Sequence, residues 1–128
     1  MTENCDSNII LENRHTGERV AMSRVKGGDE VWLKLKGFLP PHREGPPLHI
    51  HFAEDEEGHV MSGTLSAVVE GRKIAPHPGD AAPLPRGSAH RWWNEGDAPL
   101  EFLGYARPVV DLDRYLQAVF EVVNAGPE

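Results

Sequence analysis

The sequence contains a single cysteine, Cys5, among its 128 residues. One thiol cannot form an intramolecular disulfide, so the fold must rely on packing rather than on covalent cross-links. Basic residues are also scarce, because 13 Lys and Arg stand against 20 Asp and Glu and the net charge is −7. No block of positive charge occurs, so we expect neither a nucleic acid nor an anionic membrane as a partner.

Long apolar runs are missing as well. No run approaches the roughly 20 residues that a helix needs to cross a bilayer. Residues 1–8 lack the basic and apolar regions of a secretory signal, so we expect a cytoplasmic protein. The sequence shows no internal repeat, low-complexity tract or interdomain linker, and its length suits one domain with its own core.

Turn-forming residues are abundant instead. Thirteen glycines and eleven prolines are spread between short apolar runs, which favours an all-β sandwich or barrel over a helical bundle. The clearest alternation is Glu30–Lys36, in which Val31, Leu33 and Leu35 share one face. We expect further strands near residues 9–12, 20–25, 48–52, 64–69, 72–75, 81–84, 90–94 and 100–106.

After Pro108 the apolar spacing becomes helical. Apolar residues recur at i, i+3, i+4 and i+7 in Leu112, Tyr115, Leu116, Val119, Phe120 and Val123. This predicts one amphipathic helix over 111–124, with Asp111 as its N-cap and with Tyr115 and Phe120 in packing positions. The expected organisation is a flexible tail (1–8), a β-barrel (9–110) and a helix packed on that barrel.

Potential metal-binding groups gather in two stretches. His49 and His51 stand one residue apart in a predicted strand, so both imidazoles point to one face, with backbones about 6–7 Å apart. A carboxylate follows in the acidic run 54–57, most of which we expect to be a solvated turn. His90 arrives after a Pro/Gly turn. Imidazole and carboxylate groups bind divalent transition ions, so convergence of these residues would create a metal site.

The two stretches resemble the two sequence motifs of the cupin superfamily. In the first motif, His-x-His is followed after four residues by Glu and after six more by Gly, as in His49, His51, Glu56 and Gly63. The preceding glycine, Gly45, lies closer to His49 than the family pattern has it. The second motif has Gly, Pro-x-Gly, His and Asn at fixed spacing, as in Gly79, Pro85, Gly87, His90 and Asn94.

This resemblance implies an all-β jelly-roll barrel, or double-stranded β-helix, with one C-terminal helix added. It also implies one divalent transition metal ion (Fe, Mn, Ni, Cu or Zn), with four ligand positions that fall on His49, His51, Glu56 and His90. The family spacing selects Glu56 over its neighbours Glu54 and Glu57.

Three further implications concern the barrel and its partners. The interior would bind a small-molecule ligand or substrate. The alternation of the strands places Trp92, Gly58 and Val60 on its wall, and a missing side chain at Gly58 leaves room beside the ion. Family members commonly form homodimers, so a homodimer is expected.

The reaction stays open among three alternatives. A redox metal would favour dioxygenase-like oxidation, as in the quercetin-dioxygenase-like branch of the superfamily, with Glu56 as a catalytic general base. Zinc would favour a metal-dependent isomerase or cyclase, because zinc does no redox chemistry. The third alternative is a non-catalytic module that binds a metal or a ligand.

Overall fold

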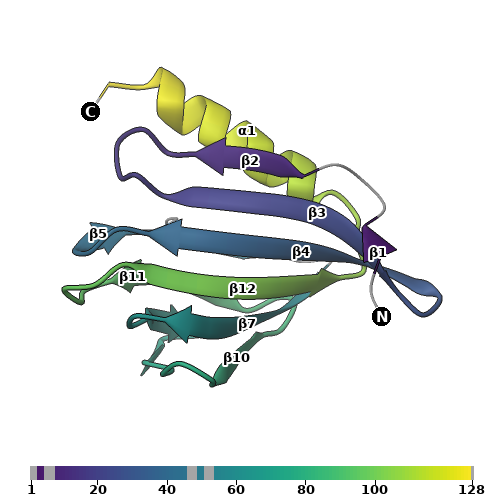
Figure 1. The fold of residues 1–128 in the computed structure, drawn as a ribbon, viewed down its shortest axis with the longest axis horizontal. Helices are drawn as coiled ribbons and strands as arrows, with labels where there is room; N and C mark the ends of the chain where they lie inside the picture. Colours follow the sequence, from purple (N-terminus) through teal and green to yellow (C-terminus); the bar gives the residue numbers. More distant parts are fainter. Residues whose placement is uncertain (1–2, 5–7, 46–48, 51–53, 128) are drawn as a thin grey trace.

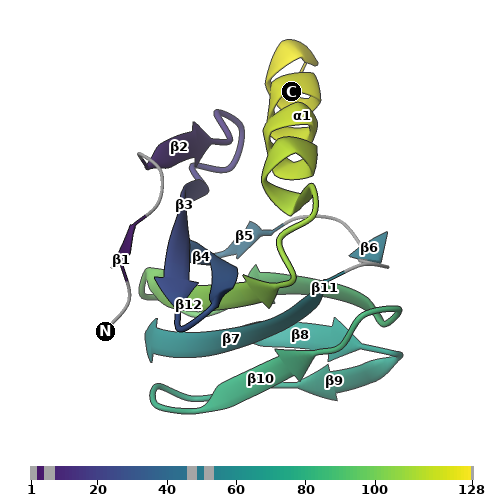
Figure 2. The ribbon, with the colours of Figure 1, turned by 90° about the vertical axis from the view of Figure 1, so that its right-hand side faces the viewer.

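The computed structural model describes residues 3–4, 8–45, 49–50 and 54–127. Two antiparallel sheets face each other as a mainly β sandwich of the jelly-roll type, and one helix follows at the C-terminus (Figures 1 and 2). This architecture confirms the predicted fold class. Among the described residues no helix is both long and apolar enough to span a bilayer.

The larger sheet has seven described strands, in the spatial order β1, β3, β4, β12, β7, β10, with β2 also paired to β3. They are β1 (Glu3–Asn4), β2 (Ile9–Glu12), β3 (Arg19–Gly27), β4 (Glu30–Leu39), β7 (Asp55–Ser62), β10 (Ala81–Leu84) and β12 (Leu100–Arg107). The smaller sheet has five described strands, in the order β5, β11, β8, β9, with β6 also paired to β11. They are β5 (Arg43–Glu44), β6 (His49–Ile50), β8 (Ser66–Val69), β9 (Arg72–Ile74) and β11 (Ala89–Asn94).

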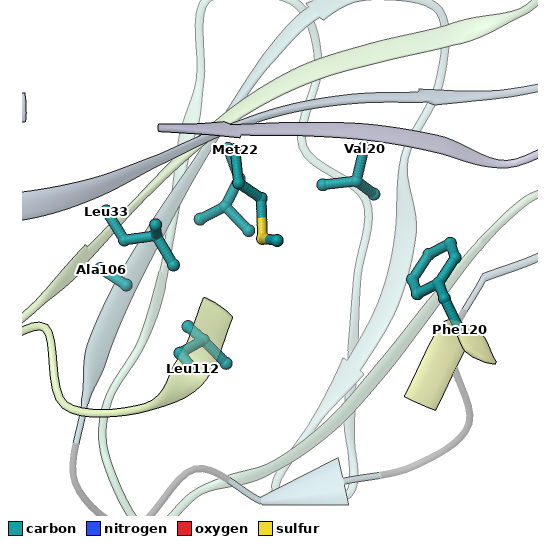
Figure 3. Close-up of a cluster of buried hydrophobic side chains, with 7 residues drawn as sticks. Val20, Met22, Leu33, Ala106, Leu112 and Phe120 are labelled. Carbon is teal, nitrogen blue, oxygen red and sulfur yellow. The ribbon is translucent and has the colours of Figure 1, made fainter. Parts of the chain in front are cut away.

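The helix α1 (Leu112–Ala125) packs against β2, β3 and β4 through one apolar face. Leu112 and Phe120 point from the helix toward Val20, Met22 and Leu33 of the sheet (Figure 3). Met22 has no exposed surface and Leu33 keeps 1%. The helical spacing of the sequence therefore matches the buried face, although Tyr115, expected to pack, is 48% exposed.

A second apolar cluster fills the space between the sheets. Leu39, Val60, Leu65 and Leu100 are buried together there, and Trp92 and Phe102 pack against them. The two aromatic rings meet edge to face with centroids 4.7 Å apart. This cluster forms the bottom of the interior in which the candidate site lies.

The expectation of a solvated turn in the acidic run was wrong. Most of the acidic run 54–57 belongs to strand β7 rather than to a solvated turn, and Glu54 is only 4% exposed. Asp111 stands at the N-cap position but makes no capping hydrogen bond with its side chain. Glu54 takes that role, because its Oε2 accepts hydrogen bonds from the backbone N–H groups of Asp111 and Leu112.

Candidate functional site

His90 lies in the middle of the smaller sheet, on β11. Alternation along this strand buries His90 and Asn94 and leaves Arg91 and Trp93 partly exposed. His90 keeps 2% of its surface, and its Nδ1 donates a hydrogen bond to the carbonyl oxygen of Ser88 at 3.2 Å. A proton on Nδ1 leaves the Nε2 lone pair as the donor for an electrophile, which is the usual arrangement of a metal-binding imidazole.

The backbone of β6 brings His49 beside His90. The register of β6 and β11 makes these two residues direct partners, with Ile50 opposite Ala89. Opposed residues in an antiparallel pair have Cα atoms about 4.5–5.5 Å apart. The two sequence motifs therefore meet as neighbouring strands. His51, the other residue of the His-x-His pair, lies outside the described residues.

Glu56 approaches from the larger sheet. It stands at the start of β7, opposite Ala106 of β12 and Leu84 of β10. Residue Glu56 as a whole is half-buried, but its carboxylate is enclosed by protein. Burial, and second to it the negative charge of Glu54, raise the pKa of Glu56 from 4.5 to about 7. A cation beside this carboxylate would favour its charged form.

Glu56 and His90 line the same cavity between the two sheets, although they come from opposite sheets. Its wall also includes Gly58, Trp92, Phe102 and Gly104. The volume is about 30 Å³, which leaves room for about two water-sized groups, such as an ion and one ligand. The rest of the wall is mainly apolar, and His59 and Arg91 are the other polar residues that line it.

Three small residues leave space in the cavity on the side of the larger sheet. Gly104 of β12, Gly58 of β7 and Ala82 of β10 are in register across three neighbouring strands. A Cβ on Gly58 would meet nothing closer than the carbonyl oxygen of Ala82, at 4.0 Å. A side chain would therefore be tolerated by the backbone but would project into the cavity, so the absence of one preserves space beside Glu56.

Val60 does not line this cavity, contrary to our expectation. It is 2% exposed and packs with Leu39, Leu65 and Leu100. The reason is that Trp92 and Phe102 pack on the same cluster and fill the interior at that level. Alternation along β7 correctly separates the inner from the outer face, but it does not show how deep each inner residue lies.

An ion pair joins the strand of Glu56, β7, to the turn at residues 85–88 that precedes His90. Asp55 accepts hydrogen bonds from the Arg86 backbone N–H, at 2.9 Å, and from its guanidinium Nη2, at 3.0 Å. The hydrogen bonds from Arg86 hold the pKa of Asp55 below its usual range. In the same turn Ser88 Oγ donates to the carbonyl oxygen of Pro85 at 2.6 Å. The carbonyl group that orients His90 is thereby fixed relative to β7.

The donor set fits a divalent transition metal ion in part. An imidazole with Nδ1 already engaged and a carboxylate face one cavity, and both are ligand types for such ions. Within the part of the chain that the structure describes, His, Cys, Asp and Glu form no group of three or more placed to hold an ion. The described side chains thus supply two of the four expected ligands, and β6 supplies the backbone of a third.

Some residues at the candidate site escaped the sequence interpretation. Gly104 and Phe102 line the cavity beside the predicted residues, and alternation in the strand Leu100–Arg107 places both on one face. A glycine inside a strand pattern is itself a signal of space or close approach, and Gly104 carried that signal. Ser88 offered no comparable signal, because its role depends on a backbone carbonyl.

Comparison with known proteins supports the resemblance of the motifs. Residues 38–104, more than half of the chain, match the protein family described as "Cupin domain". Over 79 residues the chain is 38% identical to the oxidoreductase iacF of Pestalotiopsis fici. The aligned region covers 59% of this chain and 39% of that protein. The chain therefore spans about two fifths of the length of this curated relative.

Solved structures share the fold. An RmlC-like cupin from Shewanella frigidimarina superposes with a TM-score of 0.65 at 17% identity, covering 84% of this chain and 94% of that one. A sugar phosphate isomerase of the cupin superfamily from Silicibacter pomeroyi gives a TM-score of 0.57 at 28% identity, covering 69% and 60% of the two chains. At 17% identity the first likeness shows the fold alone.

Proposed function

The chain belongs to the cupin family, and from that premise we propose that it is a metal-dependent enzyme acting on a small organic molecule in its barrel. One observation carries the proposal. The Glu56 and His90 side chains face one cavity from opposite sheets, and the register places His49 directly beside His90. We propose His49, His51, Glu56 and His90 as the four ligands of a single divalent ion.

Each group at the proposed site has a distinct role in the reaction. An ion held there would supply Lewis-acid polarisation of a substrate oxygen and, if it were iron, manganese, nickel or copper, redox chemistry with O₂. The carbonyl oxygen of Ser88 accepts a hydrogen bond from His90 Nδ1, so Nε2 is the nitrogen that would bind the ion. When it is released from the ion, a Glu56 carboxylate oxygen would accept a proton from the substrate. The apolar wall, including Trp92 and Phe102, excludes bulk water.

Oxidation is the reaction that we favour. The 38% identical relative bears the name of an oxidoreductase, although this chain spans only part of it. The described wall of the cavity is mainly apolar, which favours an apolar molecule with one ligating oxygen over a polyhydroxylated sugar, and its volume of about 30 Å³ admits only the ligating end of such a molecule. We therefore propose a dioxygenase-like oxidation of such a molecule, of the kind found in quercetin-dioxygenase-like cupins.

A metal-dependent isomerase is the second candidate. The 28% identity with the sugar phosphate isomerase of Silicibacter pomeroyi favours it. The metal distinguishes the two candidates, because a redox metal is needed for oxidation and zinc is not redox-active.

Metal analysis of untagged protein tests the proposal first. We expect about one equivalent of metal in the wild type and a large loss in His90→Ala and Glu56→Ala. His77→Ala is the control, because this imidazole is exposed and lies outside the cavity. Oxygen uptake with a panel of flavonols, diketones and phenols then tests the reaction. Unchanged metal content in His90→Ala refutes the site, and zinc without oxygen uptake favours the isomerase.

A further inference from the structure

Glu54 is an acidic side chain inside the protein, and it contacts the start of the helix. It is 4% exposed, and its Oε2 accepts hydrogen bonds from the backbone N–H of Leu112 at 3.2 Å and of Asp111 at 3.4 Å. The first N–H groups of a helix have no partner within the helix, and the helix dipole favours a negative charge there. Glu54 therefore joins the segment that enters β7 to the N-terminus of α1.

Glu54 is also two residues from Glu56. Because side chains alternate along a strand, Glu54 and Glu56 project from the same side of the chain as it enters β7. The pairing of β7 with β12 begins at Asp55, opposite Arg107, and its pairing with β10 extends only as far as Glu56, opposite Leu84. Among the described residues, the hydrogen-bonded ladder therefore starts at Asp55 and Glu56, and Glu54, which precedes it, binds the helix terminus instead.

The start of α1 is held by contacts that do not involve β7. Leu112 is 2% exposed and packs in the cluster with Met22 and Leu33. Arg24 of β3 donates through Nε and Nη2 to Asp113 Oδ2, each at 3.1 Å. The helix terminus is therefore a fixed platform, and a side chain bound to it takes its position from β3 and β4 rather than from β7.

We propose that Glu54 is a positioning residue, which holds Glu56 in the cavity by fixing the start of β7 to the N-terminus of α1. The inference rests on the proposed metal site, because position at Glu56 matters for binding an ion. It assigns to the helix a role in the site, although α1 contributes no side chain to the cavity wall.

Three substitutions separate position from charge. Glu54→Gln keeps the length of the side chain and an oxygen acceptor but removes the charge. Glu54→Asp keeps the charge but is one methylene shorter, so it does not reach the helix. Glu54→Ala removes both. Asp113→Asn is the matched control, because Asp113 is also buried, at 7% exposure, and also anchors the first turn of α1, but to β3.

The measurement is the dissociation constant of Ni²⁺ on untagged protein, by competition with a chromogenic chelator, together with the thermal midpoint of the metal-free protein. We expect Glu54→Asp and Glu54→Ala to bind Ni²⁺ about tenfold more weakly, as found for residues that orient metal ligands. Glu54→Gln and Asp113→Asn should stay within about threefold of the wild type. The thermal midpoint should fall in both Glu54→Ala and Asp113→Asn.

Four other outcomes would contradict the inference, and each points to a different cause. Wild-type affinity in Glu54→Asp would mean that reach to the helix is irrelevant. A tenfold loss in Glu54→Gln with wild-type affinity in Glu54→Asp would assign the effect to the charge of Glu54 instead. A tenfold loss in Asp113→Asn would assign it to general loosening of the helix. If the wild type binds no Ni²⁺ that His90→Ala removes, the proposed metal site itself fails and the positioning role fails with it.

Discussion

Replacing Glu18 with glutamine should stabilise the protein at pH 8 and have little effect on stability near pH 4.5. Glu18 directly precedes β3 and is 3% exposed. Burial raises its pKa from 4.5 to about 7, because the charged carboxylate loses its hydration. Glutamine has nearly the same shape and carries no charge at any pH, so it removes this cost without opening a cavity.

The sign follows from proton linkage. Between pH 4.5 and about 7 the folded protein binds a proton at Glu18 that the unfolded chain has released. The free energy of unfolding therefore falls as the pH rises through this window. At about 1.4 kcal/mol per pKa unit the full effect is about 3 kcal/mol. It is absent below pH 4.5, where both states are protonated, and complete above pH 7.

Urea unfolding of metal-free wild type and Glu18→Gln, followed by tryptophan fluorescence, measures the effect at intervals from pH 4.5 to 8. The difference in unfolding free energy between the two proteins is the informative quantity, since every other titrating group is common to both. It should grow by about 3 kcal/mol across the window. Glu121→Gln, on the exposed face of α1, should show no such growth. A difference that is constant with pH would refute the reasoning.

Three further substitutions, two of them with a matched control, test the packing. Asn94→Ala should cost about 3 kcal/mol in urea unfolding, because Asn94 Nδ2 donates to three backbone carbonyl groups in a side chain that is only 1% exposed. Met22→Ala should cost about 3 kcal/mol, whereas Met61→Ala, at a residue 55% exposed, should cost less than about 0.5. Gly63→Ala should lower the thermal midpoint at least twice as much as Gly71→Ala. Both glycines have positive φ, but only at Gly63 would a Cβ collide with the Pro99 carbonyl oxygen. Equal costs within either pair would contradict the packing described.

Much of the fold could be predicted because side-chain alternation is a local property. Leu33 and Leu35 alternate with lysines, and the structure buries both on one face of β4. The same rule predicted the inward positions of His90 and Asn94. It failed for Val31, which is 37% exposed, because this residue lies at the end of the strand, where the sheet gives it less cover.

In the candidate site, only the residues that motif spacing identifies could be predicted from the sequence. The motifs identified His90 and Glu56, and the structure places both on one cavity. The depth of Val60 and the contribution of Gly104 could not be predicted in the same way. Both depend on which residues the opposite sheet and the neighbouring strand bring to the same level, and that information is not local.

The sequence by itself determined the all-β class, the single amphipathic helix and the proposed metal ligands, because periodicity and residue type are local properties of the chain. Only the tertiary structure decided the role of the acidic run. Four consecutive acids indicated a solvated turn, but Glu54 meets Leu112 from 58 residues further on. The unpaired N–H groups at the start of α1 stabilise a buried carboxylate there, and no pattern within the run could show where that helix would begin.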